Sequence, residues 1–143
     1  MKKSILMILP AALAAIFLLA CSGGNSGAST SGNNSSSAPT TTAAVELNEW
    51  TVKPPTSAIK AGNVYLEAKN TGTRNHELRI SRLGGASPQA IGIIESFQPA
   101  QTKSKEFALT PGQYELSCQL AEQEGGQVIA HYALGMKVNI IVE

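Results

Sequence analysis

The sequence predicts an all-β protein, an antiparallel Greek-key β-sandwich, that follows an N-terminal targeting segment. Apolar residues alternate with polar residues at a period of two along several short runs. Turn-forming residues separate these runs at short intervals. The part of the chain with this pattern, residues 45–143, is long enough for one modest core and too short for two.

The first twenty residues have the pattern of an N-terminal targeting signal. Lys2 and Lys3 form a basic start, and an apolar run from Ile5 to Ala20 follows. This run is too short, and too closely followed by a cleavage motif, to predict a membrane span. The motif is the lipobox Leu18-Leu19-Ala20-Cys21. In a lipobox, cleavage precedes the cysteine, and the cysteine then carries lipid.

We therefore expect residues 1–20 to be a lipoprotein signal peptide and Cys21 to be the lipidation site. An ordinary secretory signal is the alternative. The expected location is the bacterial cell envelope, with a lipid anchor and the domain facing the periplasm or the cell exterior. Loss of the two N-terminal lysines takes the formal charge from +1 to −1. A nearly neutral chain offers no basic stripe for nucleic acid.

Residues 21–44 are expected to form the lipidated cysteine and a flexible linker. From residue 22 to 42 the chain is almost wholly Gly, Ser, Asn, Thr and Ala, with no aromatic or charged residue. Such a composition buries too little apolar surface to offset the entropy of ordering. The folded domain is therefore expected at residues 45–143.

The alternating runs of this domain predict its strands. They are Val64-Leu66-Ala68, His76-Leu78-Ile80, Phe107-Leu109, Tyr114-Leu116-Cys118 and Met136-Val138-Ile140-Val142. An earlier run changes parity between Leu47 and Trp50, which predicts a bulge. One short helix is expected from Ser87 to about Ser96, opened by Ser87-Pro88.

The domain contains few soft metal ligands, and their types match one kind of metal site. They are His76, Cys118, His131 and Met136. Two imidazoles and a thiolate with a weak axial thioether are the ligand set that tunes a Cu(I)/Cu(II) couple for electron transfer. If Cys21 carries lipid, Cys118 has no disulfide partner, and an unpaired thiol outside the cytoplasm favours burial or ligation. The strand phases point three of the four inward, and His131 lies on the loop before Met136.

The chain resembles the cupredoxins, the plastocyanin-like blue copper proteins. The segments that carry the resemblance are Ala61-Gly62-Asn63-Val64 through Asn70-Thr71-Gly72, Pro111 through Cys118, and His131-Tyr132-Ala133-Leu134-Gly135-Met136. The resemblance implies a cupredoxin-like fold with one type 1 copper. It also implies that His76 and His131 are the equatorial imidazoles, Cys118 the thiolate and Met136 the axial ligand.

The loop between Cys118 and His131 is longer than in most cupredoxins. It includes Glu122, Glu124, Gly125 and Gly126, and its length is similar to that of a less characterised secreted branch of the family. We expect the two glutamates to be a solvated loop face. Trp50 is expected in the core or on a sheet face. The loop raises the question of whether the hydrogen bonds to the cysteine sulfur are kept.

These observations lead to a functional hypothesis: a membrane-tethered type 1 copper protein that carries single electrons outside the cytoplasm. His131 would present a ring edge near Tyr132, Ala133 and Leu134 to a redox partner protein such as a cytochrome or oxidase. We expect a monomer that binds no nucleic acid. No acid–base pair or nucleophile triad is visible, so no enzyme is expected. The alternatives are an extracytoplasmic copper-binding or copper-handling protein, and a metal-free cupredoxin-like interaction module.

Overall fold

The computed structural model describes residues 41–54, 56 and 58–143. The expected signal peptide, Cys21 and most of the expected linker lie outside the described residues. In the described part of the chain, all regular elements are strands. That part has no helix of the length and apolarity needed to cross a membrane. The expected all-β class is therefore confirmed.

The strands follow one another with short connections. Their bounds are β1 Thr41–Asn48, β2 Thr51–Lys53, β3 Ala58–Ile59, β4 Gly62–Asn70, β5 His76–Arg82, β6 Gln89–Phe97, β7 Thr102–Leu109, β8 Gly112–Ser117, β9 Ala121–Glu124, β10 Gln127–Ala130 and β11 Lys137–Val142.

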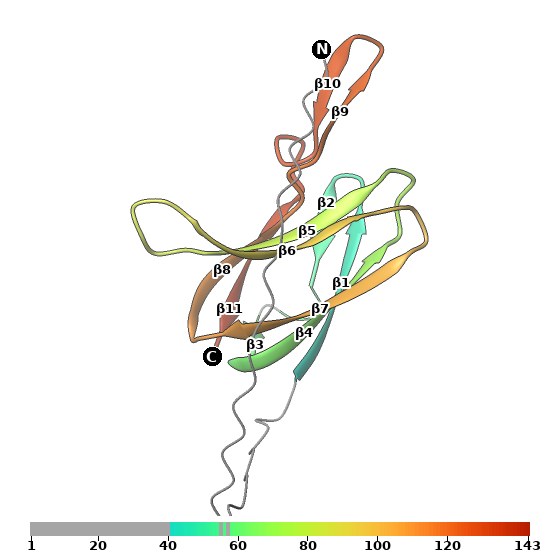
Figure 1. Ribbon diagram of the computed structural model, residues 1–143. Coiled ribbons are helices and arrows are strands. Elements are labelled where there is room, and N and C mark those ends of the chain that lie inside the picture. The colour runs from blue at the N-terminus through green and yellow to red at the C-terminus, as the bar shows by residue number, and fades with distance from the viewer. Residues whose placement is uncertain (1–40, 55, 57) are drawn as a thin grey trace, which may run out of the picture. The chain divides into compact units, whose positions relative to one another are not determined.

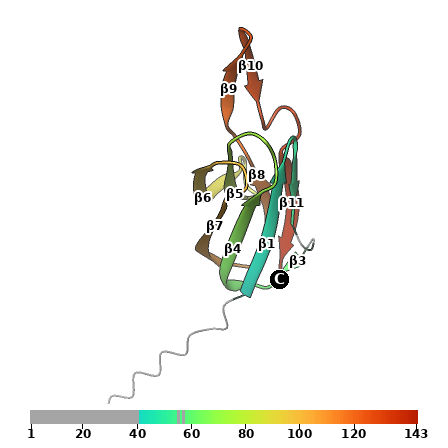
Figure 2. The same cartoon turned by 90° about the vertical axis from the view of Figure 1, so that its right-hand side faces the viewer.

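Two sheets pack face to face, and a hairpin extends from one end of the sandwich (Figures 1 and 2). One sheet has the order β2-β1-β4-β7, and the other has the order β3-β11-β8-β5-β6. The hairpin consists of β9 and β10, which pair with each other. Both sheets are mixed, because β1 runs parallel to β4 and β3 runs parallel to β11. The expected all-antiparallel pairing is wrong at these two places.

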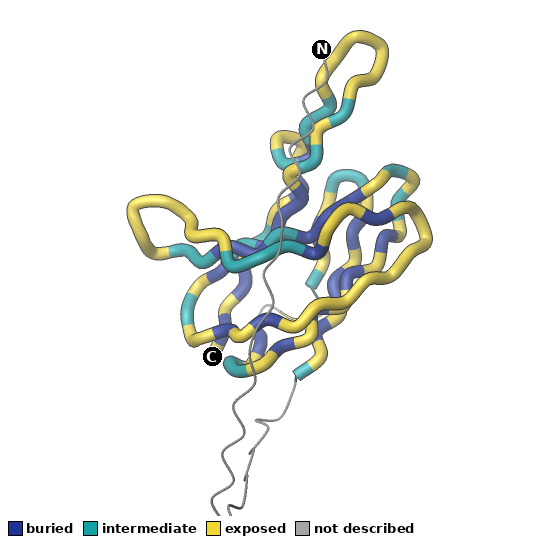
Figure 3. Tube along the Cα trace, viewed as in Figure 1, coloured by how far each residue is buried: buried dark blue, intermediate teal, exposed yellow. Residues whose placement is uncertain are grey.

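The core lies between the sheets. Along β1 and β4 every second residue is buried, as the period of two predicts. Figure 3 shows buried segments lining the interior and exposed segments at the hairpin tip and the β5–β6 turn. Some of the side chains that fill the core are fully inaccessible to solvent: Val45, Leu47, Val64, Leu66, Ile80 and Leu116.

The folded domain begins before residue 45. Residues 41–44 were expected in the linker, but they form the start of β1 and pair with β4 from Val64 to Glu67. Ala43 is buried in the core. Backbone pairing with β4, rather than burial of large apolar side chains, holds this segment in the sheet. Its composition therefore did not indicate a strand.

The parity change near Trp50 comes from a tight turn rather than a bulge. β1 and β2 form an antiparallel hairpin in which Leu47 faces Val52 and Asn48 faces Thr51. Only Glu49 and Trp50 lie between the strands. The turn leaves both of these side chains free to approach the end of the sandwich.

The short helix expected from Ser87 to Ser96 is wrong, because Gln89–Phe97 is strand β6. β6 pairs with β5, where Leu78 faces Ile94 and Ile80 faces Gly92. The isoleucines of this segment are β-branched and favour an extended backbone. The register shifts of this pairing interrupt the alternation of apolar and polar residues, which is the pattern that identifies a strand from its sequence.

Asn70 fixes the loop that leads from β4 to β5. Its side chain is fully buried, and its amide nitrogen donates to the carbonyl oxygens of Arg74 (2.7 Å) and Phe97 (3.2 Å). Its side-chain oxygen accepts from the backbone N–H of Gly72 at 2.9 Å. These bonds set the path of the chain into His76, the first residue of β5.

We predict that Asn70→Ala lowers the free energy of unfolding by about 2–3 kcal/mol, because it leaves buried backbone groups without partners. Urea denaturation of the purified protein measures the change. Asn63→Ala is the control, because Asn63 lies on the same strand with an exposed side chain. An equal loss in both variants would show that Asn70 does not hold the loop.

Candidate metal centre

The order of the strands brings three chain segments to one end of the sandwich. β8 lies between β5 and β11 and is antiparallel to both. The end of β8 therefore lies beside the starts of its two neighbours, and Ser117 faces both Arg79 and Lys137. His76 begins β5, Cys118 follows β8, and Met136 precedes β11. The fold alone thus gathers these three residues.

Three of the four expected ligands converge on one point. The ligand atoms of His76, Cys118 and His131 all lie within 4.8 Å of one another. Cys118 Sγ is 3.4 Å from Nδ1 of His131 and 3.9 Å from Nδ1 of His76. The two imidazole rings lie edge to face with centroids 5.2 Å apart. All three side chains are buried, with exposures of 0–1%.

His131 lies on the turn between β10 and β11. Its backbone N–H donates to the carbonyl oxygen of Leu120 at 3.0 Å, and its own carbonyl oxygen accepts from Met136 at 3.1 Å. The first bond fixes the residue against the chain that follows Cys118. The second closes the turn that carries the imidazole toward the sulfur.

Met136 is fully buried and adjoins the other candidates through its backbone. Its carbonyl oxygen accepts from the N–H of Cys118 at 3.0 Å. Gly135 before it adopts φ +115°, a conformation that glycine tolerates and other residues rarely adopt. The axial role of the Met136 thioether stays a prediction.

The sulfur of Cys118 lies in an environment that favours the neutral thiol in the absence of a cation. Burial raises the pKa of Cys118, and the backbone N–H groups of Glu77 and Leu120 oppose that rise. The N–H of Glu77 lies 3.5 Å from Sγ. The Glu77 carboxylate accepts from the N–H of Gln119 at 3.2 Å, so one residue of β5 contacts both the sulfur of Cys118 and the residue that follows it.

His76 is held in its neutral form, the form that binds metals. Burial lowers its pKa, and the neighbouring His131 lowers it further, while Glu49 opposes the change. The Nε2 atom of His76 lies 3.4 Å from Oε1 of Glu49, without hydrogen-bond geometry.

Glu49 is itself fixed by the chain that precedes His76. Its Oε1 accepts from the backbone N–H groups of Thr73 at 2.7 Å and Arg74 at 2.8 Å. Burial alone would raise the pKa of Glu49, but backbone hydrogen bonds from Glu49, Thr73 and Arg74 bring it below its usual value. A carboxylate is thus anchored beside the outer nitrogen of His76.

A second carboxylate lies against the outer nitrogen of His131. Oε1 of Glu122 is 3.1 Å from Nε2 of His131 and 2.8 Å from Nη1 of Arg74. Arg74, and then His131, lower the pKa of the Glu122 carboxyl. An ionised carboxylate only accepts hydrogen bonds, so a hydrogen bond at this contact requires the proton on Nε2. In the neutral imidazole this leaves the lone pair of Nδ1 directed to the Cys118 sulfur.

The structure adds to two expectations about the surroundings of the site and corrects a third. The side chains of Glu122 and Glu124 are 40% and 60% exposed, as a solvated face requires, but Glu122 also contacts His131 and Glu124 also binds Arg74. The loop that carries them forms the β9–β10 hairpin. His131 does not present a ring edge to solvent, because Glu122 and Trp50 cover it, and the Trp50 ring lies 5.0 Å from the imidazole.

Sequence reasoning missed Glu49, Arg74 and Glu77 as parts of this site. Each is charged, and a charged residue at a strand end or turn usually faces water. The only available signal was the position of Glu77 and Arg74 within two residues of His76.

The donor set fits copper. Two imidazole nitrogens and one sulfur, all buried and close to one another, make up the His₂Cys donor set of blue copper sites. Soft sulfur and borderline nitrogen donors disfavour magnesium and calcium, which prefer oxygen ligands.

Comparison with known proteins agrees with this geometry. The cupredoxin-like domain model matches residues 11–130. The chain belongs to the cupredoxin-like family. His76 and Cys118 lie within the matched range, whereas His131 and Met136 follow its end. No curated protein sequence matches the chain.

Solved structures of three cupredoxins share the fold. Dithionite-reduced auracyanin from Roseiflexus castenholzii aligns with a TM-score of 0.51 at 21% identity, over 73% of this chain and 96% of that one. Auracyanin A, a blue copper protein from Chloroflexus aurantiacus, gives 0.54 at 16% identity, over 73% and 100%. Rusticyanin from Thiobacillus ferrooxidans gives 0.52 at 18% identity, over 73% and 77%.

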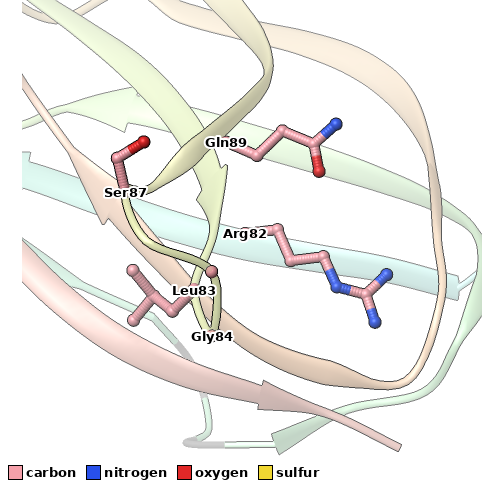
Figure 4. A pocket seen from close by; sticks show the side chains of 6 residues that line it. Arg82, Leu83, Gly84, Ser87 and Gln89 are labelled. Carbon is pink, nitrogen blue, oxygen red and sulfur yellow. The ribbon is translucent and has the colours of Figure 1, made fainter.

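A separate hollow of about 510 Å³ lies at the other end of β5, at the β5–β6 turn (Figure 4). Arg82 and Gln89 extend to the same side of this turn. The Arg82 guanidinium already donates to Thr110 and to the carbonyl oxygen of Pro111. The hollow therefore lacks a free charged group, and the metal centre remains the candidate site.

We predict that Gly72→Ala displaces Glu49 from its place beside His76. A Cβ at residue 72 would lie 2.5 Å from Oε1 of Glu49, so the carboxylate would swing away and lose its backbone donors. The expected cost is about 1–3 kcal/mol of unfolding free energy, measured by urea denaturation. In the control Gly85→Ala, the nearest atom lies at an ordinary 3.5 Å. A Gly72→Ala variant as stable as the control would contradict this account of Glu49.

Proposed function

We propose that this chain is a membrane-tethered type 1 copper protein that carries single electrons outside the cytoplasm. The observation that carries the proposal is the convergence of the ligand atoms of His76, His131 and Cys118 within 4.8 Å in the buried end of the sandwich. A metal-free interaction module has no need for three polar donors close together in its core, because burying polar groups costs free energy.

The residues that surround the donors hold them in place before any metal binds. Backbone hydrogen bonds connect Cys118 to Met136 and His131 to Leu120, so the segments with the donors are tied to one another. A bound copper ion would supply the Cu(I)/Cu(II) couple. The rigid donors would limit the change of geometry between the two oxidation states, and their burial excludes water from the site.

The tether and the location rest on the sequence. The lipobox ending at Cys21 and the polar stretch after it favour a lipid-anchored domain in a bacterial cell envelope, facing the periplasm or the exterior. We propose a monomer that exchanges electrons with a redox partner protein such as a cytochrome or oxidase, through a weak and transient encounter. We propose no enzymatic activity of its own.

We predict that the full-length protein, purified in detergent, binds one copper per chain and shows an intense visible band from thiolate-to-copper charge transfer. Cys118→Ser should abolish the band, because the hydroxyl oxygen does not replace the soft thiolate. Visible spectroscopy during a Cu(II) titration measures both. Cyclic voltammetry of the loaded protein tests for a reversible couple.

The same titration separates the alternatives. Tight Cu(I) binding without the visible band would replace the electron carrier with a copper-handling protein. Absence of stoichiometric copper binding would leave a cupredoxin-like interaction module. Colour that persists in Cys118→Ser would show that the assignment of the sulfur ligand is wrong.

We predict that Met136→Leu keeps the visible band and raises the reduction potential. Leucine has nearly the same volume, so the core is kept, while the axial sulfur that helps to stabilise Cu(II) is lost. Voltammetry measures the potential, and thermal unfolding controls for damage to the core. An unchanged potential in a stable variant would contradict the axial role of Met136.

We predict that Cys21→Ser releases the protein from the membrane fraction of the cells that express it. The serine hydroxyl cannot take the place of the thiol that receives lipid. Fractionation with immunodetection, together with labelling by a radioactive fatty acid, measures the anchor. Cys118→Ser is the matched control and should stay with the membrane. Equal membrane association of both variants would rule out Cys21 as the anchor.

A further inference from the structure

The β9–β10 hairpin contacts the rest of the domain through the carboxylates of β9, which bind Arg74 and His131. Figures 1 and 2 show that it projects beyond the sandwich, and its strands pair only with each other. Most of its side chains are exposed. Glu122 on β9 is the hairpin residue that reaches the metal centre, through Nε2 of His131 at 3.1 Å.

Arg74 holds this glutamate in place. Its guanidinium donates to Glu122 at 2.8 Å, donates to Glu124, and lies 5.7 Å above the ring of Trp50. Trp50 in turn packs against the imidazole of His131. The cation, the aromatic ring and the carboxylate thus enclose the outer side of His131, which is only 1% exposed.

The same arginine also serves the other imidazole. Its backbone N–H donates to Glu49, whose carboxylate lies beside Nε2 of His76. Arg74, a single residue of the β4–β5 loop, therefore positions the acidic groups next to both candidate histidine ligands. The guanidinium acts on the His131 side and the backbone acts on the His76 side.

We propose that Glu122, held by Arg74, is a positioning residue for the ligand His131. Its carboxylate accepts a hydrogen bond from the Nε2–H group, directs the lone pair of Nδ1 to the metal, and fixes the orientation of the ring. The β9–β10 hairpin is thus part of the metal centre rather than a passive insertion. This inference rests on the proposed copper site. A hydrogen-bonded outer nitrogen also makes the ligand a stronger donor, which favours the oxidised metal.

The test compares Glu122→Ala with Glu124→Ala in the full-length protein. Both variants remove one negative charge and one partner of Arg74 from the same hairpin, but only Glu122 contacts His131. Glu122→Gln is a third variant, because its amide oxygen retains an acceptor for the Nε2 proton.

The first readout needs no metal. Long-range proton–nitrogen NMR of the metal-free protein with ¹⁵N-labelled histidine reports which ring nitrogen of His131 carries the proton. We expect the Nε2–H tautomer in the wild type, Glu124→Ala and Glu122→Gln, and a mixture of tautomers in Glu122→Ala. A wild-type protein with the proton on Nδ1 would overturn the proposal, and so would an unchanged tautomer in Glu122→Ala.

The second readout is Cu(I) affinity, measured by competition with a chromophoric chelator. Loss of a positioning partner of a metal ligand typically weakens binding about 10- to 100-fold, so we expect this loss in Glu122→Ala and less than about 3-fold in Glu124→Ala. Equal losses in the two variants would overturn the proposal. If the wild type binds no copper, the proposed function fails, whereas the NMR readout still decides the role of Glu122 at His131.

Discussion

Two imidazole nitrogens approach the Cys118 sulfur inside the end of the sandwich. The rest of the structure depends on this constraint. The sulfur lies 3.4 and 3.9 Å from the two Nδ1 atoms, and all three side chains are shielded from water. Polar groups buried in this way need partners, and the two Nδ1 atoms and the N–H of Glu77 surround the sulfur. A cation bound among them would stabilise the thiolate and use both nitrogen lone pairs. The pairing of β5, β8 and β11 positions two of the donors, and the turn before β11 positions the third.

Around these donors the chain builds an acidic outer layer. Glu49 lies beside His76, and Glu122 lies beside His131, while Arg74 connects the two through its backbone and its guanidinium. This layer draws on the β1–β2 turn, the β4–β5 loop and the β9–β10 hairpin, which are far apart in the sequence. The long segment after Cys118 therefore does more than extend a loop. It contributes a carboxylate that orients a ligand and covers the ring edge where a redox partner was expected to dock.

The sequence predicted the parts of the site that depend on strand periodicity. Because side chains alternate across a sheet, the phases of His76-Leu78-Ile80 and Tyr114-Leu116-Cys118 were sufficient to place both ligands inward. The contacts of Glu49 and Glu122 could not be found in this way, because both depend on charged side chains that meet Arg74 from 25 and 48 positions away. Strand β6 was mistaken for a helix, since its register shifts hide the alternation. The start of β1 was missed because backbone pairing, which composition does not record, holds residues 41–44 in the sheet.

X-ray absorption at the copper edge of the loaded full-length protein tests the central claim most directly, because it reports the atoms bound to the metal. The account predicts a first shell with two imidazole nitrogens and one short copper–sulfur bond. A shell of nitrogen and oxygen atoms without that short sulfur bond would contradict it, because the metal would then lie away from the three buried donors.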